Sequence, residues 1–131
     1  MSTPTKQEII LAKMQKAADT LLSAENLLED GFLLGAVNRI YYACFYTASA
    51  LLFQQDIYSK THSGVQQMFS LHFIKTGILD KAFGEFFSII FINRQHTDYD
   101  DFIDIEEDEI KNYVTSAKKF IQSALSILNQ K

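Results

Sequence analysis

Residues 31–55 form a long stretch with a single charged side chain, Arg39. The other positions are apolar, aromatic or small, so the stretch must either cross a membrane or be buried as a central helix. A charge at the bilayer centre costs about 2.5 to 3.5 kcal/mol, and three tyrosines lie in the middle of the stretch rather than at its rims. We therefore predict no membrane span but a helix buried on most of its sides, in a bundle or also against a second copy in a homodimer.

Residues that break helices are scarce, with 1 proline and 5 glycines among 131 residues. Long uninterrupted elements are therefore expected. The length suits one domain spanning residues 1–131, and 47% hydrophobic residues supply its core. A lone cysteine, Cys44, cannot form an internal disulfide, and no signal-peptide pattern opens the sequence. These features predict a cytoplasmic protein.

Apolar residues recur at three- and four-residue steps through the rest of the chain, which is the period of an amphipathic helix. The first helix is predicted to begin at Pro4 or Thr5, where Thr5 and Glu8 have the spacing of a capping box, and to end near Gly31. Further helices are predicted to begin after Thr61 or Ser63, at Asp80 and near Asp104. The fold class predicted is all-α, an antiparallel bundle of four to five helices.

The net charge of -4 is unevenly distributed. Residues 98–109 carry half of the 16 carboxylates and no basic side chain, so the rest of the molecule is mildly positive. An acidic loop that leads into a helix N-terminus explains this segment without any function, because the helix dipole favours carboxylates there. The positive remainder is compatible with an anionic partner.

The two arginines each follow an asparagine within an apolar helical stretch, as Asn38-Arg39 and Asn93-Arg94. A buried guanidinium group requires a carboxylate or a phosphate, and its planar fork suits two-point hydrogen bonding to either. Each arginine therefore either forms an internal ion pair or binds a ligand.

Two short segments carry the remaining candidate chemistry. Arg94, His96, Asp98 and Tyr99 crowd one predicted helix end, where they would bind a phosphodiester and move protons near neutral pH. The other segment, residues 59–64, places Lys60 and His62 beside hydroxyl groups, as an anion site or a helix cap. Spacings typical of zinc, calcium or di-iron sites, of phosphate-binding loops and of serine nucleophiles do not occur, so neither a metal nor a cofactor is expected.

Four segments in order resemble the small prokaryotic HEPN-domain proteins, named for a nucleotide-binding domain of higher eukaryotes and prokaryotes. They are residues 38–46, 59–64, 73–77 and 94–99. The resemblance implies a helical bundle, commonly a homodimer with a groove between subunits. It also implies a metal-independent ribonuclease that acts as a toxin beside a minimal nucleotidyltransferase, the antitoxin that adenylylates it.

The active motif of that family is an arginine with a histidine four to six positions later. Here His96 follows Arg94 by only two positions, and Asp98 stands where the first such histidine would be. Tyr99 resembles the tyrosine that follows the motif and is a candidate modification site.

Two functions compete on these grounds. As a ribonuclease, the chain would use Arg94 to hold the scissile phosphate and His96, or in second place His62, to transfer protons. As a binding module without cleavage, it would bind a nucleotide or the nucleotidyltransferase, with Arg94 paired to Asp98 or another internal carboxylate. The residues assigned to such binding are Asn38, Arg39, Tyr42, Lys60 and His62.

Overall fold

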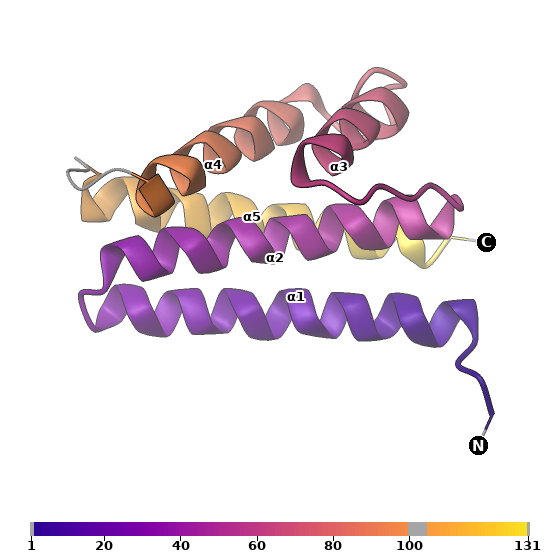
Figure 1. The fold of residues 1–131 in the computed structure, drawn as a ribbon, viewed down its shortest axis with the longest axis horizontal. Coiled ribbons are helices and arrows are strands. Elements are labelled where there is room, and N and C mark those ends of the chain that lie inside the picture. Colours follow the sequence, from indigo (N-terminus) through magenta and orange to yellow (C-terminus); the bar gives the residue numbers. More distant parts are fainter. Residues whose placement is uncertain (1, 100–104, 131) are drawn as a thin grey trace.

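The computed structural model describes residues 2–99 and 105–130, except for the side chains of residues 97–99, and most of this chain is helical (Figure 1). Its helices are α1 (Lys6–Glu29), α2 (Leu33–Gln54), α3 (His62–Phe69), α4 (Lys81–Tyr99) and α5 (Glu107–Leu128). A π-helical turn, η1 (Ser70–Ile74), extends α3. The all-α bundle predicted from the sequence is confirmed.

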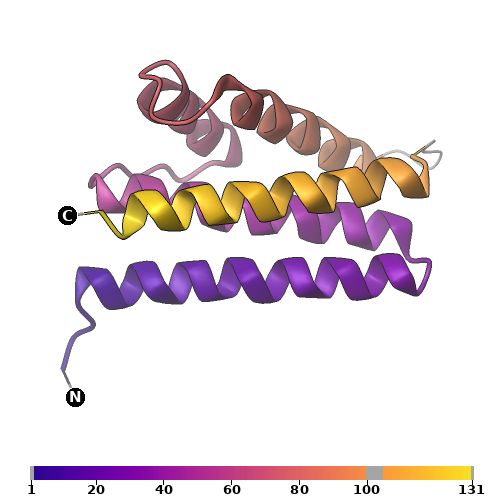
Figure 2. The same cartoon turned by 180° about the vertical axis from the view of Figure 1, so that it is seen from behind.

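Helix α2 is the centre of the bundle, because it contacts α1, α3, α4 and α5. Helices α1 and α4 run opposite to it on two sides (Figure 1), and α5 runs alongside in the same direction (Figure 2). The chain's own helices thus bury most of the apolar stretch at residues 31–55, although Phe32 and Leu34 at its start remain exposed. Within the described residues, no helix is both long enough and apolar enough to cross a membrane.

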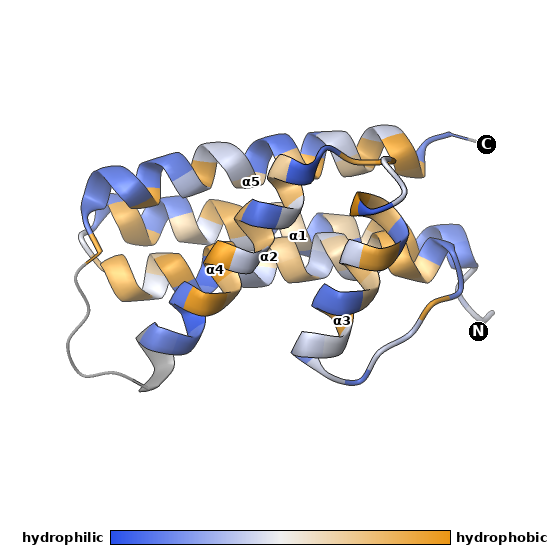
Figure 3. Ribbon diagram, turned by 90° about the horizontal axis from the view of Figure 1, so that it is seen from above, coloured by the Kyte–Doolittle hydropathy of each residue, from blue (hydrophilic) through white to orange (hydrophobic). Residues whose placement is uncertain are grey.

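The core follows α2 along its length, and Figure 3 shows apolar residues there and polar residues on the outer side of α5. Ile40, Tyr41 and Leu51 of α2 are fully buried, as are Ile90 of α4 and Phe120 of α5. Burying a large apolar side chain contributes about 1.5 to 3 kcal/mol. Cys44 is also fully buried, and this burial raises the pKa of its thiol.

Local signals place both ends of α1 and the start of α4 where the sequence predicts them, whereas α5 begins at Glu107 rather than near Asp104. The Thr5 hydroxyl accepts a hydrogen bond from the Glu8 backbone N–H at 3.1 Å, and the Glu8 carboxylate accepts one from the Thr5 N–H at 3.3 Å. This capping box starts α1. Gly31 ends it with a φ of 84°, a conformation that only glycine adopts at little cost. Asp80 caps α4 by accepting from the Ala82 N–H at 2.8 Å.

The start of α3 follows one of the two predicted alternatives. Thr61, rather than Ser63, is the N-cap, with its hydroxyl accepting from the Gly64 N–H at 2.9 Å, so His62 is the first residue of α3. Gly64 lies so close to the side chains of Ser59 and Thr61 that an added methyl group would overlap their hydroxyl oxygens. The tight wrap of this loop around Gly64 fixes where His62 enters the helix.

Candidate functional site

Arg94 of α4 reaches across to α2. Its Nη2 donates to the Tyr42 hydroxyl at 3.1 Å, and its guanidinium carbon lies 5.4 Å from the ring centre of Tyr41 and 5.6 Å from that of Tyr42. The Nε atom of the same group is buried. Cation–π contacts gain strength when they are desolvated, so these rings both orient the guanidinium and stabilise its charge.

Arg39 approaches the same tyrosine from its own helix. Its guanidinium carbon lies 5.0 Å from the Tyr42 ring centre, and its Nε and Nη2 donate to the Asn38 side-chain oxygen at 3.1 and 2.7 Å. The acceptor is a neutral amide rather than a carboxylate, and Arg39 is half-buried rather than enclosed in the helical layer. Two arginines therefore meet at the Tyr42 ring, where Arg39 donates to the Asn38 amide oxygen and Arg94 donates to the Tyr42 hydroxyl.

His62 completes the group from the first turn of α3. Its Nδ1 lies 2.6 Å from the Tyr41 hydroxyl, and its ring lies 4.4 Å from that of Phe45. Desolvation by these surroundings, with a smaller contribution from the positive charge of Arg94, lowers the pKa of His62 below its ordinary value of 6.5. The imidazole is therefore neutral at pH 7 and able to accept a proton.

Tyr41 is the buried support of this arrangement. It is fully buried in α2, and burial raises the pKa of its hydroxyl, which consequently stays protonated. We call Arg39, Tyr41, Tyr42, His62 and Arg94 the Tyr42 cluster. It combines two fixed positive charges with a neutral base, an arrangement suited to binding an anion and transferring a proton beside it.

The cluster joins residues that the sequence analysis assigned to different functions. Arg94 comes from the predicted catalytic set, and Arg39 and Tyr42 come from the predicted binding set. His62 comes from the predicted binding set and is also the second candidate for proton transfer. Sequence reasoning missed Tyr41 as a member. Tyr41 lies three and four residues before Cys44 and Phe45, and this spacing predicts a core residue. Only the packing of α3 on α2 brings His62 to the Tyr41 hydroxyl.

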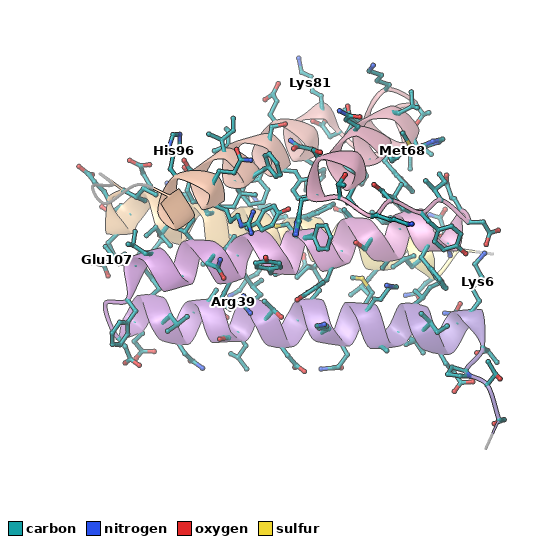
Figure 4. All side chains as sticks on the ribbon, viewed as in Figure 1. Lys6, Arg39, Met68, Lys81, His96 and Glu107 are labelled. Atoms are coloured by element: carbon teal, nitrogen blue, oxygen red, sulfur yellow. The ribbon has the colours of Figure 1, made fainter. Side chains whose placement is uncertain are left out.

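His96 lies away from the cluster. It is exposed in the last turn of α4, and Figure 4 shows it on the side of α4 away from α2. Residues two apart on a helix do not face each other, so the structure separates His96 from Arg94. Lys60 is exposed in the loop before α3, and the side chains of Asp98 and Tyr99 lie outside the described residues.

Comparison with known proteins agrees with the resemblance seen in the sequence. The HEPN domain family matches residues 11–128. A UPF0332 protein of Thermotoga maritima is 37% identical over 118 residues, which cover 90% of this chain and 89% of that protein. The putative toxin MJ0142 of Methanocaldococcus jannaschii is 37% identical over 118 residues, which cover 90% of this chain and 80% of that protein. The putative toxin MJ0605 of the same organism is 31% identical over 124 residues, which cover 95% of this chain and 92% of that protein. The chain belongs to the HEPN family.

Proposed function

We propose that this HEPN protein is a toxin-like ribonuclease that cleaves RNA at the Tyr42 cluster without a metal ion. The observation that carries the proposal is the contact of His62, a base that is neutral at pH 7, with Tyr41 beside the guanidinium of Arg94. The names of two relatives, both putative toxins, support the toxin-like role.

In this proposal the arginines bind the scissile phosphate. Arg94 presents a guanidinium fixed by Tyr41 and Tyr42, and Arg39 adds a second positive charge at the same ring. Charges held in place before the reaction stabilise the extra negative charge of the transition state without further reorganisation. Arg94 is the main phosphate ligand because its guanidinium lies over Tyr41, the residue whose hydroxyl contacts His62.

His62 supplies the proton transfer. The mechanism uses the tautomer in which Nδ1 donates to the Tyr41 oxygen across the 2.6 Å contact, which leaves Nε2 to take the proton of a ribose 2′-hydroxyl. The 2′-oxygen then forms a bond to phosphorus while the bond from phosphorus to the 5′-oxygen breaks, and the imidazolium returns its proton to that oxygen. The products are a 2′,3′-cyclic phosphate and a 5′-hydroxyl end. His96 is the second candidate proton carrier.

The toxin-like role also implies partners. We propose a minimal nucleotidyltransferase as the antitoxin, with Tyr99 as the residue it modifies, and a homodimer as the working assembly. Ile89 and Ile92 of α4 are 47% and 50% exposed and offer an apolar surface for the second copy. Light scattering that gives a 15 kDa particle at micromolar concentration would exclude the dimer.

A second candidate function is binding without cleavage. This function is favoured by the hydrogen bonds from Arg94 to Tyr42 and from Arg39 to Asn38. These bonds use N–H groups of each guanidinium that would otherwise be available to a phosphate. In that case the Tyr42 cluster binds a nucleotide or stabilises the surface on which the nucleotidyltransferase docks.

Cleavage of single-stranded RNA in the presence of a chelator tests the proposal. We expect His62→Ala to lower the rate by about a hundredfold or more, the usual scale for a positioned acid or base. His96→Ala is the matched control and should retain the wild-type rate. If the two variants exchange these outcomes, His96 is the proton carrier. If the wild type leaves RNA intact but binds a nucleotide or the nucleotidyltransferase, the binding function replaces the ribonuclease.

A further inference from the structure

Three aromatic rings of α2 each have a cation over one face. The Arg39 guanidinium lies 5.0 Å from the Tyr42 ring, the Lys16 ammonium 4.6 Å from Tyr46 and the Lys13 ammonium 5.4 Å from Phe53. We call these six residues the α2 strip.

The strip is straight because of helical geometry. Positions 42, 46 and 53 fall on one side of an α-helix, and at 1.5 Å per residue they span ~16 Å. The lysines come from α1, which runs antiparallel beside α2, so their order along the strip matches that of the rings. Each ring contact modestly favours the observed position of its ammonium or guanidinium group, so the three positive charges lie in a row along α2.

Two hollows lie along this row. One of about 450 Å³ is lined by Lys16, Arg39 and polar side chains of α1, and a smaller one of about 120 Å³ is lined by Lys13, Ser49 and Ser59, among others. Asp19 is the one carboxylate among their described lining residues, and it accepts a hydrogen bond from Gln15 at 2.9 Å. The strip is therefore predominantly positive.

The end of the strip away from Arg94 carries an exposed aromatic ring. Tyr58 is 71% exposed and meets the edge of Phe53, with ring centres 5.9 Å apart. A row of positive charges that ends at an exposed aromatic ring is suited to binding single-stranded nucleic acid. The phosphates of such a strand contact basic side chains, and its bases stack on aromatic ones.

We propose that single-stranded RNA binds along the α2 strip, with its phosphates on Arg39, Lys16 and Lys13 and a base stacked on Tyr58. This inference rests on the proposed function, since it supplies the path by which RNA reaches the Tyr42 cluster. At the ~3.4 Å spacing of stacked nucleotides, the ~16 Å strip accommodates about five of them. Affinity should thus increase with length up to roughly that size.

The test is fluorescence anisotropy with labelled 2′-O-methyl RNA oligomers, which lack the hydroxyl needed for cleavage. We expect the double variant Lys13→Gln, Lys16→Gln to bind a hexamer about 10- to 30-fold more weakly at 0.1 M salt. The slope of log affinity against log salt should decrease in magnitude by about 1.4, because two phosphate contacts are lost from a single strand. In this double variant, the increase in affinity from a dinucleotide to a hexanucleotide should disappear. Tyr58→Ala should weaken binding of the hexanucleotide several-fold.

The matched control is Lys81→Gln, Lys119→Gln, which removes the same charge from exposed positions on α4 and α5 (Figure 4 labels Lys81). Equal affinity of the two double variants for the RNA would overturn the proposal. A wild-type protein that does not bind RNA but binds polyglutamate through Lys13 and Lys16 would also overturn it, and the α2 strip would then be a protein-docking surface. Neither result would by itself refute ribonuclease activity, which the cleavage assay with His62→Ala tests separately.

Discussion

The same dipeptide, Asn-Arg, occurs in α2 and in α4, and the two copies are used differently. In α2, Asn38 accepts two hydrogen bonds from its own neighbour, Arg39. In α4, Asn93 donates to the Tyr113 hydroxyl of α5 at 2.9 Å, and Arg94 donates to Tyr42 of α2. The first pair is held within one helix, whereas the second ties three helices together.

This difference assigns separate roles to the two arginines. The position of Arg39 depends on its own helix, so it is present wherever α2 is folded. The position of Arg94 depends on α4 packing against both α2 and α5, so the Tyr42 cluster exists only when the bundle is complete. Arg94 is also the arginine whose charge affects His62. We therefore expect activity to depend on Arg94 more than on Arg39.

Substitution of the two arginines gives the largest expected effect. Arg94→Ala should reduce RNA cleavage in chelator by at least about a hundredfold, because it removes the phosphate ligand nearest the base. Arg39→Ala should reduce it by about tenfold or less. Arg94→Lys, which keeps the charge but not the planar fork, should recover only part of the rate. Equal losses from the two alanine variants would contradict the separate roles.

The two asparagines should differ in stability. Asn93→Ala removes a half-buried hydrogen bond between α4 and α5 and should lower the free energy of unfolding by about 1 kcal/mol. Asn38→Ala removes two hydrogen bonds between adjacent residues of one helix and should cost less than about 0.5 kcal/mol. Urea denaturation followed by circular dichroism measures both variants. A larger loss for Asn38→Ala would show that α2 itself depends on this pair.

Tyr42→Phe probes the contact that both arginines share. It removes the hydroxyl to which Arg94 donates but keeps the ring that both guanidinium groups contact. We expect a several-fold decrease in cleavage rate with unchanged helicity, since one hydrogen bond contributes about 0.5 to 1.5 kcal/mol. Tyr46→Phe removes a hydroxyl from the next turn of α2 and serves as the control for cleavage.

The smallest expected effect is a change in the pKa of His62 when either arginine is replaced. Arg94→Gln should raise the pKa of His62 towards 6.5, but not all the way, because desolvation is the larger cause of its depression. Arg39→Gln should leave it closer to the wild-type value. NMR titration of the imidazole resonances distinguishes the two variants. A higher His62 pKa in Arg39→Gln than in Arg94→Gln would contradict this expectation.

The same shift fixes how activity and stability depend on pH. Cleavage should rise as pH increases through the depressed His62 pKa, because the base must be neutral, and level off above it. The unfolded chain holds the proton more tightly than the folded one in this range. The contribution of His62 to stability is therefore complete above pH 6.5 and declines as pH falls through the folded-state pKa.

The sequence was sufficient to predict the bundle because its signals are local. The apolar stretch at residues 31–55, the capping box at Thr5 and the Asp80 cap each depend on neighbouring residues, and each prediction is confirmed. The sequence was not sufficient to group the site residues. Proximity in the sequence associated Arg94 with His96, two positions away, although residues two apart on a helix do not face each other.

The partners found in the structure are distant in sequence. Arg94 meets Tyr42 across 52 positions, and Tyr41 meets His62 across 21. Such contacts arise only from the way α3 and α4 pack on α2, which no local pattern encodes. The preference for His96 over His62 as the proton carrier followed from reading each motif by itself.

The burial of Cys44 has a practical consequence for optical work on this protein. Only a thiolate reacts readily with maleimide or iodoacetamide dyes, and this thiol is both buried and held protonated by its raised pKa. The folded chain thus behaves towards such dyes as though it had no cysteine. A cysteine introduced at exposed Lys60 would be labelled alone, and the colour or lifetime of its dye would report when the neighbouring surface becomes occupied.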